Sequence, residues 1–163
     1  MIVLYIGGIK SGKSRAAEAR ALELSQHPVY LATSEIIDDE MHERVLKHQQ
    51  QREDRFRVLE EPLHIAEVLN REKETVLVEC LSMWINNMLY YKKSHEEILS
   101  EVKNILHSSN HRIFVINDVG SGVIPMDSLS RAFVDLTGII SQMISSEARE
   151  VYHCIAGIAT RIK

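Results

Sequence analysis

The chain has 163 residues and a formal net charge of −4 at pH 7, and 45% of its residues are hydrophobic. This length suits one domain whose core needs neither a metal nor a disulfide, so we expect a single domain over residues 1–163. Acidic and basic residues are interspersed, which argues against a nucleic-acid surface or a polybasic membrane anchor and favours a small-molecule substrate.

The first residues contain no basic stretch followed by a leader-like apolar core, and no apolar run approaches the length that spans a membrane. The two cysteines, Cys80 and Cys154, are far apart in the sequence, and each lies in an apolar run. This pattern fits two buried thiols in a reducing compartment better than a disulfide or a metal site. We therefore expect a cytoplasmic protein.

The stretch Gly7-Gly8-Ile9-Lys10-Ser11-Gly12-Lys13-Ser14 fits the phosphate-loop (P-loop) pattern, in which Lys and Ser follow two glycines separated by four residues. The pattern lets backbone N–H groups surround phosphate oxygens, while Lys13 supplies a cation and Ser14 a hydroxyl for Mg²⁺. Residues 2–6 before it form an apolar run of strand length, and residues 15–22 after it are strong helix formers. The pattern therefore predicts a nucleoside triphosphate site; the alternative is a Gly-rich turn without a ligand.

Residues 29–34 predict a second strand that ends in small hydroxyl residues, at the sheet edge where open α/β proteins bind ligands. A long helix is predicted from about residue 36 to residue 55. His48 shares one face of this helix with Arg44 and Arg52. From the residues alone two interpretations stay open: a solvated amphipathic face with an incidental His, or a nucleophile or anion site where Arg side chains hold phosphate oxygens.

The apolar run 75–79 ends in Glu79, as expected of a buried parallel strand that delivers a carboxylate to Mg²⁺ beside the P-loop. Residues 112–116 predict another strand, followed over 117–125 by a loop with two glycines and a proline. That loop is either a substrate-binding loop or an ordinary turn. Residues 151–163 predict a strand or a strand pair.

Strand and helix alternate along the whole chain. Further helices are predicted over residues 63–69, 81–91, 95–107 and 128–149. The apolar stripe in residues 81–91 is predicted to be core or a subunit contact. Together with the P-loop, the alternation predicts an α/β fold of the P-loop NTPase type, with a mainly parallel sheet flanked by helices on both faces.

More specific patterns follow one another in order along the chain. They lie at residues 7–14, 30–34, 39–52, 60–62, 78–87, 117–125, 131–142 and 157–163. In content and order they resemble the bifunctional adenosylcobinamide kinase/adenosylcobinamide-phosphate guanylyltransferase family of cobalamin synthesis. The chain departs from the family pattern at Ile9-Lys10, Ser141 and Arg149, and none of these departures removes a predicted catalytic group.

The resemblance implies two reactions and a homotrimer of P-loop subunits with a RecA-like core. A nucleoside triphosphate, ATP or GTP, first phosphorylates adenosylcobinamide. GTP then guanylylates His48, pyrophosphate leaves, and GMP passes to adenosylcobinamide phosphate to give adenosylcobinamide-GDP. A neutral imidazole is a competent nucleophile towards phosphorus, and the resulting phosphoramidate is reactive enough to transfer GMP.

The same resemblance implies the roles of the site residues. Residues 7–14 hold the GTP phosphates, Lys13 stabilises the leaving pyrophosphate, and Ser14 with Glu79 binds Mg²⁺ directly or through water. Glu60 can accept hydrogen bonds from guanine groups that adenine lacks. The expected nucleoside contacts are Thr33, Ser34, Glu35, Gln49, Gln50, Gln51, Arg52 and Glu60. Asn117 and Asp118 are expected to face the corrinoid.

Two other functions remain compatible with the residues. One is a small-molecule kinase that uses Lys13, Ser14 and Glu79 but whose His48 is only structural, so that no covalent nucleotide adduct forms. The other is a nucleotide-regulated binding module with slow turnover. Corrinoid-dependent product distinguishes an enzyme from the module, and a GMP adduct distinguishes the bifunctional enzyme from the plain kinase.

Overall fold

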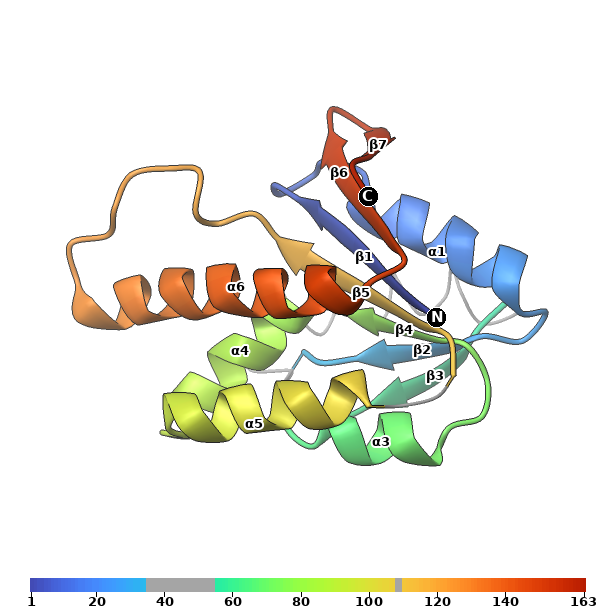
Figure 1. Ribbon diagram of the computed structural model, residues 1–163, viewed down its shortest axis with the longest axis horizontal. Coiled ribbons are helices and arrows are strands. Elements are labelled where there is room, and N and C mark those ends of the chain that lie inside the picture. The colour runs from blue at the N-terminus through green and yellow to red at the C-terminus, as the bar shows by residue number, and fades with distance from the viewer. Residues whose placement is uncertain (35–54, 108–109) are drawn as a thin grey trace, which may run out of the picture.

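The computed structural model describes residues 1–34, 55–107 and 110–163 (Figure 1). Its centre is one sheet with the strand order β3-β2-β4-β5-β1-β6-β7. The strands are β1 (Ile2–Gly7), β2 (Val29–Ala32), β3 (Arg57–Glu60), β4 (Val76–Glu79), β5 (Arg112–Asn117), β6 (Glu150–Ile155) and β7 (Ile158–Arg161). All neighbours are parallel except β6 and β7, which form an antiparallel hairpin. The predicted mainly parallel sheet is therefore confirmed.

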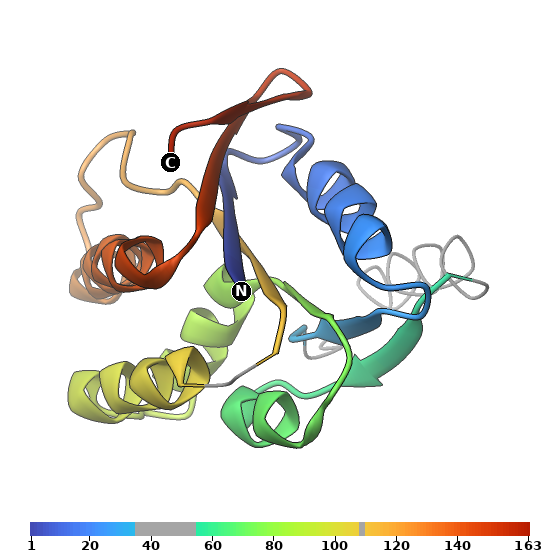
Figure 2. The same cartoon turned by 45° about the vertical axis from the view of Figure 1, so that its right-hand side comes forward.

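Helices cover both faces of this sheet. In the described part of the chain they are α1 (Lys13–Leu24), α3 (Ile65–Arg71), α4 (Leu81–Tyr90), α5 (His95–Leu106) and α6 (Ser128–Glu147). Helix α1 packs on one face, against β1, β4 and β5, and α3, α4, α5 and α6 cover the opposite face (Figure 2). This arrangement confirms the predicted α/β fold of the P-loop NTPase type. The predicted helix over residues 36–55 lies outside the described residues.

Strand β1 is held on both edges and both faces. It pairs with β5 on one edge and with β6 on the other. Val3 and Tyr5 belong to the core cluster on the α1 side, whereas Leu4 belongs to the cluster on the opposite side. A continuous apolar run is what such a doubly covered strand requires. The P-loop therefore starts from a rigid point in the middle of the fold.

The apolar stripe of α4 packs in the core, which is one of the two roles predicted for it, core or subunit contact. Leu81, Trp84, Ile85 and Met88 are all buried. The indole N–H of Trp84 donates a hydrogen bond of 2.8 Å to the carbonyl of Leu63, so the one polar atom of this large side chain is satisfied. The stripe therefore fixes α4, and with it the chain directly after β4, against the sheet.

Two features of the fold were absent from, or left open by, the sequence interpretation. Strand β3 was missed, because its four residues are exposed or half-buried and show neither strict alternation nor a continuous apolar run. The closing segment is a strand pair, with a tight turn in which Ala156 and Gly157 both have positive φ. This turn brings the hairpin back towards the P-loop.

Arg112, the first residue of β5, is fully buried at the amino edge of the sheet. Its guanidinium donates hydrogen bonds to the backbone carbonyls of Leu69, Glu72, Glu74 and His111. Burial lowers the pKa of Arg112 to about 10, partly offset by the nearby Glu72 carboxylate, so the side chain stays charged at neutral pH. One cation thus joins the end of α3, the segment before β4 and the start of β5.

Candidate nucleotide site

The P-loop lies between β1 and α1, and α1 begins at Lys13. The loop needs unusual backbone angles: Lys10 has φ 60° and Gly12 has φ 91°. The side chain of Lys13 is buried, and its ammonium donates a hydrogen bond of 3.1 Å to the carbonyl of Gly8. The cation is therefore held over the loop whose N–H groups face the phosphates of a bound nucleotide.

Ser14 and Glu79 lie side by side, as the sequence predicted from two distant segments. The Ser14 hydroxyl donates a hydrogen bond of 2.7 Å to Oε1 of Glu79. Ser14 is in the first turn of α1, and Glu79 is the last residue of β4, with β5 between that strand and β1. A hydroxyl and a carboxylate together are the hard oxygen ligands that Mg²⁺ prefers, so these two residues fit the predicted metal.

The rest of the described structure offers no competing metal centre. Within residues 1–34, 55–107 and 110–163, no group of three or more His, Cys, Asp or Glu side chains is arranged to hold a metal ion. Mg²⁺ at nucleotide sites is commonly bound by one or two side chains together with phosphate oxygens and water. The Ser14–Glu79 pair matches that mode, in which the nucleotide supplies the remaining ligands.

The β6–β7 turn is a part of the site to which the sequence interpretation gave no role. The N–H of Gly157 donates a hydrogen bond of 2.9 Å to the carbonyl of Ser11 in the P-loop. A Cβ atom added to Gly12 would lie 2.8 Å from the Cα of Gly157, a distance that side chains do not tolerate. The pattern at residues 157–163 was the only sequence signal for this turn. The structure shows that the turn supports the P-loop.

A cavity of about 690 Å³ opens above the P-loop. It is lined by Ile9, Lys10, Ser11, Gly12, Lys13, Ser14, Arg15, Glu18, Asn117 and Gly157. Six of the eight predicted phosphate-binding positions, residues 9–14, line this cavity. Gly7 and Gly8 do not, although the Gly8 carbonyl accepts a hydrogen bond from the Lys13 ammonium. The structure therefore brings most of the predicted P-loop residues around one cavity.

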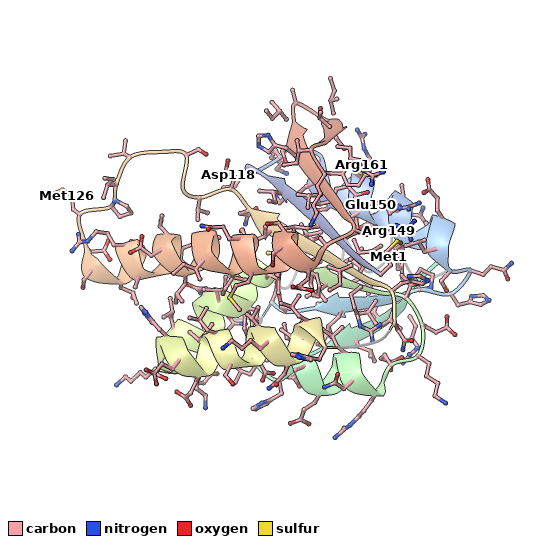
Figure 3. The ribbon with its side chains drawn as sticks, viewed as in Figure 1. Met1, Asp118, Met126, Arg149, Glu150 and Arg161 are labelled. Carbon is pink, nitrogen blue, oxygen red and sulfur yellow. The ribbon has the colours of Figure 1, made fainter. Side chains whose placement is uncertain are left out.

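Asn117 and Asp118 were both expected to face the corrinoid, and their surroundings differ from each other. Asn117 lines the P-loop cavity, and its backbone N–H donates to the buried hydroxyl of Ser82 at 2.8 Å. Asp118 directly follows β5 at the start of the loop that leads to α6 (Figure 3). Its carboxylate accepts a 2.7 Å hydrogen bond from Ser121 and lies 4.0 Å from Nε2 of His153. A corrinoid contact at either residue stays a prediction.

Thr33 has a structural role in this geometry. Its side chain is fully buried. The hydroxyl donates to the carbonyl of Cys80 at 2.8 Å and accepts from the Cys80 N–H at 2.9 Å, while Asn87 donates to the Thr33 carbonyl at 2.7 Å. Because both functions of the hydroxyl are used, Thr33 fixes the chain directly after Glu79. A contact between Thr33 and guanosine stays a prediction.

The other predicted nucleoside contacts lie towards the far edge of the sheet or outside the described residues. Glu60 ends β3 and shares a register row with Ala32 of β2 and Glu79 of β4. Ser34 follows β2 at the same edge and is half-buried. Glu35, His48, Gln49, Gln50, Gln51 and Arg52 lie outside the described residues. The contacts predicted for these residues stay predictions.

The two thiols are free and buried, as predicted. Burial raises the pKa of Cys80 to about 11, and the neighbouring Glu79 carboxylate acts in the same direction. Burial also raises the pKa of Cys154. Both side chains are therefore neutral thiols near pH 7, which are poor nucleophiles, so neither is a candidate for covalent catalysis.

Comparisons with known proteins agree with this geometry. A family model described as cobinamide kinase / cobinamide phosphate guanyltransferase matches residues 3–162. The bifunctional adenosylcobalamin biosynthesis protein CobU of Escherichia coli is 33% identical, with 100% of both chains covered. The bifunctional adenosylcobalamin biosynthesis protein CobP of Pseudomonas aeruginosa is 36% identical over 98% of this chain and 96% of its own length. CobU of Salmonella typhimurium is 30% identical, again with 100% of both chains covered. The chain belongs to the cobinamide kinase / cobinamide phosphate guanyltransferase family.

Proposed function

We propose that this chain phosphorylates adenosylcobinamide with ATP or GTP and then transfers GMP from GTP to adenosylcobinamide phosphate, giving adenosylcobinamide-GDP and pyrophosphate. The structural observation that carries the proposal is the contact between Ser14 and Glu79 at the P-loop cavity. Membership of the family supports both activities in one chain. Both reactions act on a nucleoside triphosphate, and one set of phosphate-binding groups can serve both.

The chain's own residues supply binding and charge. Backbone N–H groups of residues 8–14 and the N-terminus of α1 bind the phosphate oxygens. The ammonium of Lys13, close to the loop, stabilises negative charge that develops on the bridging oxygen as a phosphate bond breaks. Ser14 and Glu79 are the residues that would hold Mg²⁺, which when bound neutralises phosphate charge and orients the triphosphate.

The nucleophile in the second reaction is proposed to be His48, on the strength of the family pattern around it. A ring nitrogen attacks the α-phosphorus of GTP, an N–P bond forms, and the bond to pyrophosphate breaks. A phosphate oxygen of adenosylcobinamide phosphate then attacks the same phosphorus, and the N–P bond breaks. Each step exchanges one bond at phosphorus, so GMP is carried on the protein between them.

The experiment that tests this proposal is intact-protein mass spectrometry after incubation with Mg²⁺ and GTP. The wild type should gain the mass of GMP, and acid should remove it, because a phosphoramidate is labile to acid. His48→Ala should gain no mass yet still phosphorylate adenosylcobinamide. His27→Ala is the matched control, because His27 is exposed on the connection before β2 and should leave the adduct unchanged.

The outcome separates the candidate functions. An adduct that persists in His48→Ala would overturn the assignment of the nucleophile. No adduct on any protein, together with phosphorylation of adenosylcobinamide, would favour the plain kinase. Nucleotide binding without any corrinoid product would favour the binding module.

We further propose a cytoplasmic homotrimer. Two free, buried thiols support a reducing compartment. None of the described helices is long and apolar enough to cross a membrane. Self-association is supported by exposed isoleucines on and beside the edge hairpin, namely Ile155, Ile158 and Ile162. Light scattering after size exclusion gives the mass, and a monomer at working concentration would contradict the trimer.

A further inference from the structure

The P-loop cavity extends beyond the residues that bind phosphates. Its wall also includes the side chains of Ile9, Arg15 and Glu18 and the backbone of Gly157, to which no contact with a ligand's nucleoside has been given. Gly157 belongs to the β6–β7 turn, and Arg15 and Glu18 lie on the first turns of α1. In the sheet order the β6–β7 turn lies on the opposite side of β1 from Glu79.

The direction of a bound triphosphate follows from the two ends of the cavity. The P-loop Lys reaches the β- and γ-phosphates, and the P-loop Ser contacts the Mg²⁺ that bridges them. Ser14 and Glu79 mark that end on the β4 side of β1. The α-phosphate and the nucleoside then point the other way, towards β6.

We propose that the nucleoside of the triphosphate bound for the kinase step lies against the β6–β7 turn, between Ile9, Arg15 and Gly157. This inference rests on the proposed function only for the identity of the reaction, since it concerns how a P-loop nucleotide is bound. It gives the hairpin a direct part in binding the phosphate donor.

The distances within the sheet favour the turn over the predicted guanosine contacts for this pose. The turn touches the P-loop directly, through the 2.9 Å bond from Gly157 to Ser11. Glu60 ends a strand four positions away from β1 in the sheet order. Because neighbouring strands are about 4.8 Å apart, that strand lies about 19 Å to the side of the P-loop strand. A nucleoside near Glu60 therefore requires a second orientation of the nucleotide, in which the triphosphate extends from the P-loop past Glu79 towards β3.

The side chains on the hairpin side suit a purine. Ile9 is 85% exposed and offers an apolar surface to one face of a base. The guanidinium of Arg15 comes within 3.6 Å of the position that a Cβ on Gly157 would occupy, so it lies beside the turn. A planar guanidinium can stack on a base or bond to the α-phosphate. The absence of a side chain at Gly157 leaves the turn open to the ligand.

The test compares a nucleotide with inorganic tripolyphosphate, which has the phosphates but no nucleoside. Calorimetric titrations use Mg²⁺ with α,β-methylene analogues of ATP and GTP, which cannot transfer a nucleotidyl group, and the tighter-binding analogue is followed. We expect Ile9→Ser to weaken analogue binding about tenfold, because the aliphatic surface that a base would cover is lost, and to leave tripolyphosphate binding within about twofold. Arg15→Ala should weaken analogue binding by at least about tenfold.

Arg71→Ala is the matched control for loss of an exposed arginine, because Arg71 is 81% exposed on α3, away from the cavity. Ile9 is so exposed that its substitution leaves the core intact, and thermal melting checks this for each variant. Equal losses for the analogue and tripolyphosphate in Ile9→Ser would overturn the proposal, because the residue would then act on the phosphates. Unchanged analogue binding in both variants would also overturn it. Neither result depends on corrinoid turnover, so failure of the proposed reactions stays distinguishable.

Discussion

Replacement of Arg112 by Met tests the account of the amino edge of the sheet. The guanidinium donates to four backbone carbonyls, of Leu69, Glu72, Glu74 and His111. Met has a similar length and fills the space, but it donates no hydrogen bond. The substitution therefore removes the donors and leaves the carbonyls behind.

The magnitude follows from two opposing effects. Hydrogen bonds from a charged group contribute about 1.5 kcal/mol each at the low end, so the four bonds contribute roughly 6 kcal/mol. Against this stands the cost of burying the charge: the pKa of Arg112 falls from its ordinary 12.5 to about 10, which corresponds to roughly 3 kcal/mol. The free energy of unfolding should thus fall by about 3 kcal/mol, and for a chain of this length Tm should fall by about 6–12 °C.

The assay is urea unfolding followed by far-UV circular dichroism, with thermal melting as a second measure. Arg71→Ala is the control, because its 3.4 Å pair with Glu67 is exposed and should contribute less than about 0.5 kcal/mol. Activity per folded molecule should be unchanged in Arg112→Met, since Arg112 starts β5 and the nucleotide site lies at the other end of the strands. A loss below about 1 kcal/mol would refute the reasoning, because the four bonds would then do little more than offset the buried charge.

Three further predictions concern the site and the thiols. Glu79→Gln keeps the shape but removes the charge beside Ser14, so the Mg²⁺ concentration for half-maximal adduct formation should rise at least about tenfold; an unchanged dependence would contradict the metal assignment. Gly157→Ala forces a side chain into φ 83°, which costs about 1–2 kcal/mol, so Tm should fall and nucleotide binding weaken, whereas Gly120→Ala, with open space around it, should change neither. Cys80 and Cys154 should resist a thiol reagent at pH 8, because their pKa values are raised and the reactive thiolate forms only at higher pH. The denatured protein should react with two equivalents of the reagent, one for each cysteine. Fast labelling of the native protein would contradict the burial of the two thiols.

The sequence predicted those parts of the fold in which local pattern and burial agree. The apolar runs of β1, β4 and β5 are buried on both faces, so their composition marks them as strands. Strand β3 was not predicted, because an edge strand with exposed or half-buried residues has no such apolar pattern. The meeting of Ser14 and Glu79 could be predicted because P-loop chemistry requires a metal-binding carboxylate near the loop.

Other contacts depend on the path of the whole chain, which periodicity does not encode. The hydroxyl of Thr33 follows a strand, where a ligand contact was the natural expectation, yet it bonds to the backbone of Cys80. Nothing in the local sequence shows that the turn at Gly157 returns to Ser11. Asn117 was correctly placed at the carboxyl edge, but only the structure shows that it lines the P-loop cavity.

The hairpin contact also constrains when the site can form during synthesis. Both strand partners of β1 come from residues 112–117 and 150–155, which leave the ribosome well after the P-loop. The hydrogen bond from Gly157 to Ser11 joins two residues that are 146 positions apart in the sequence. A nascent chain that lacks its last strands therefore has an unsupported P-loop. Chains released before the hairpin is made should not compete with finished enzyme for nucleotide.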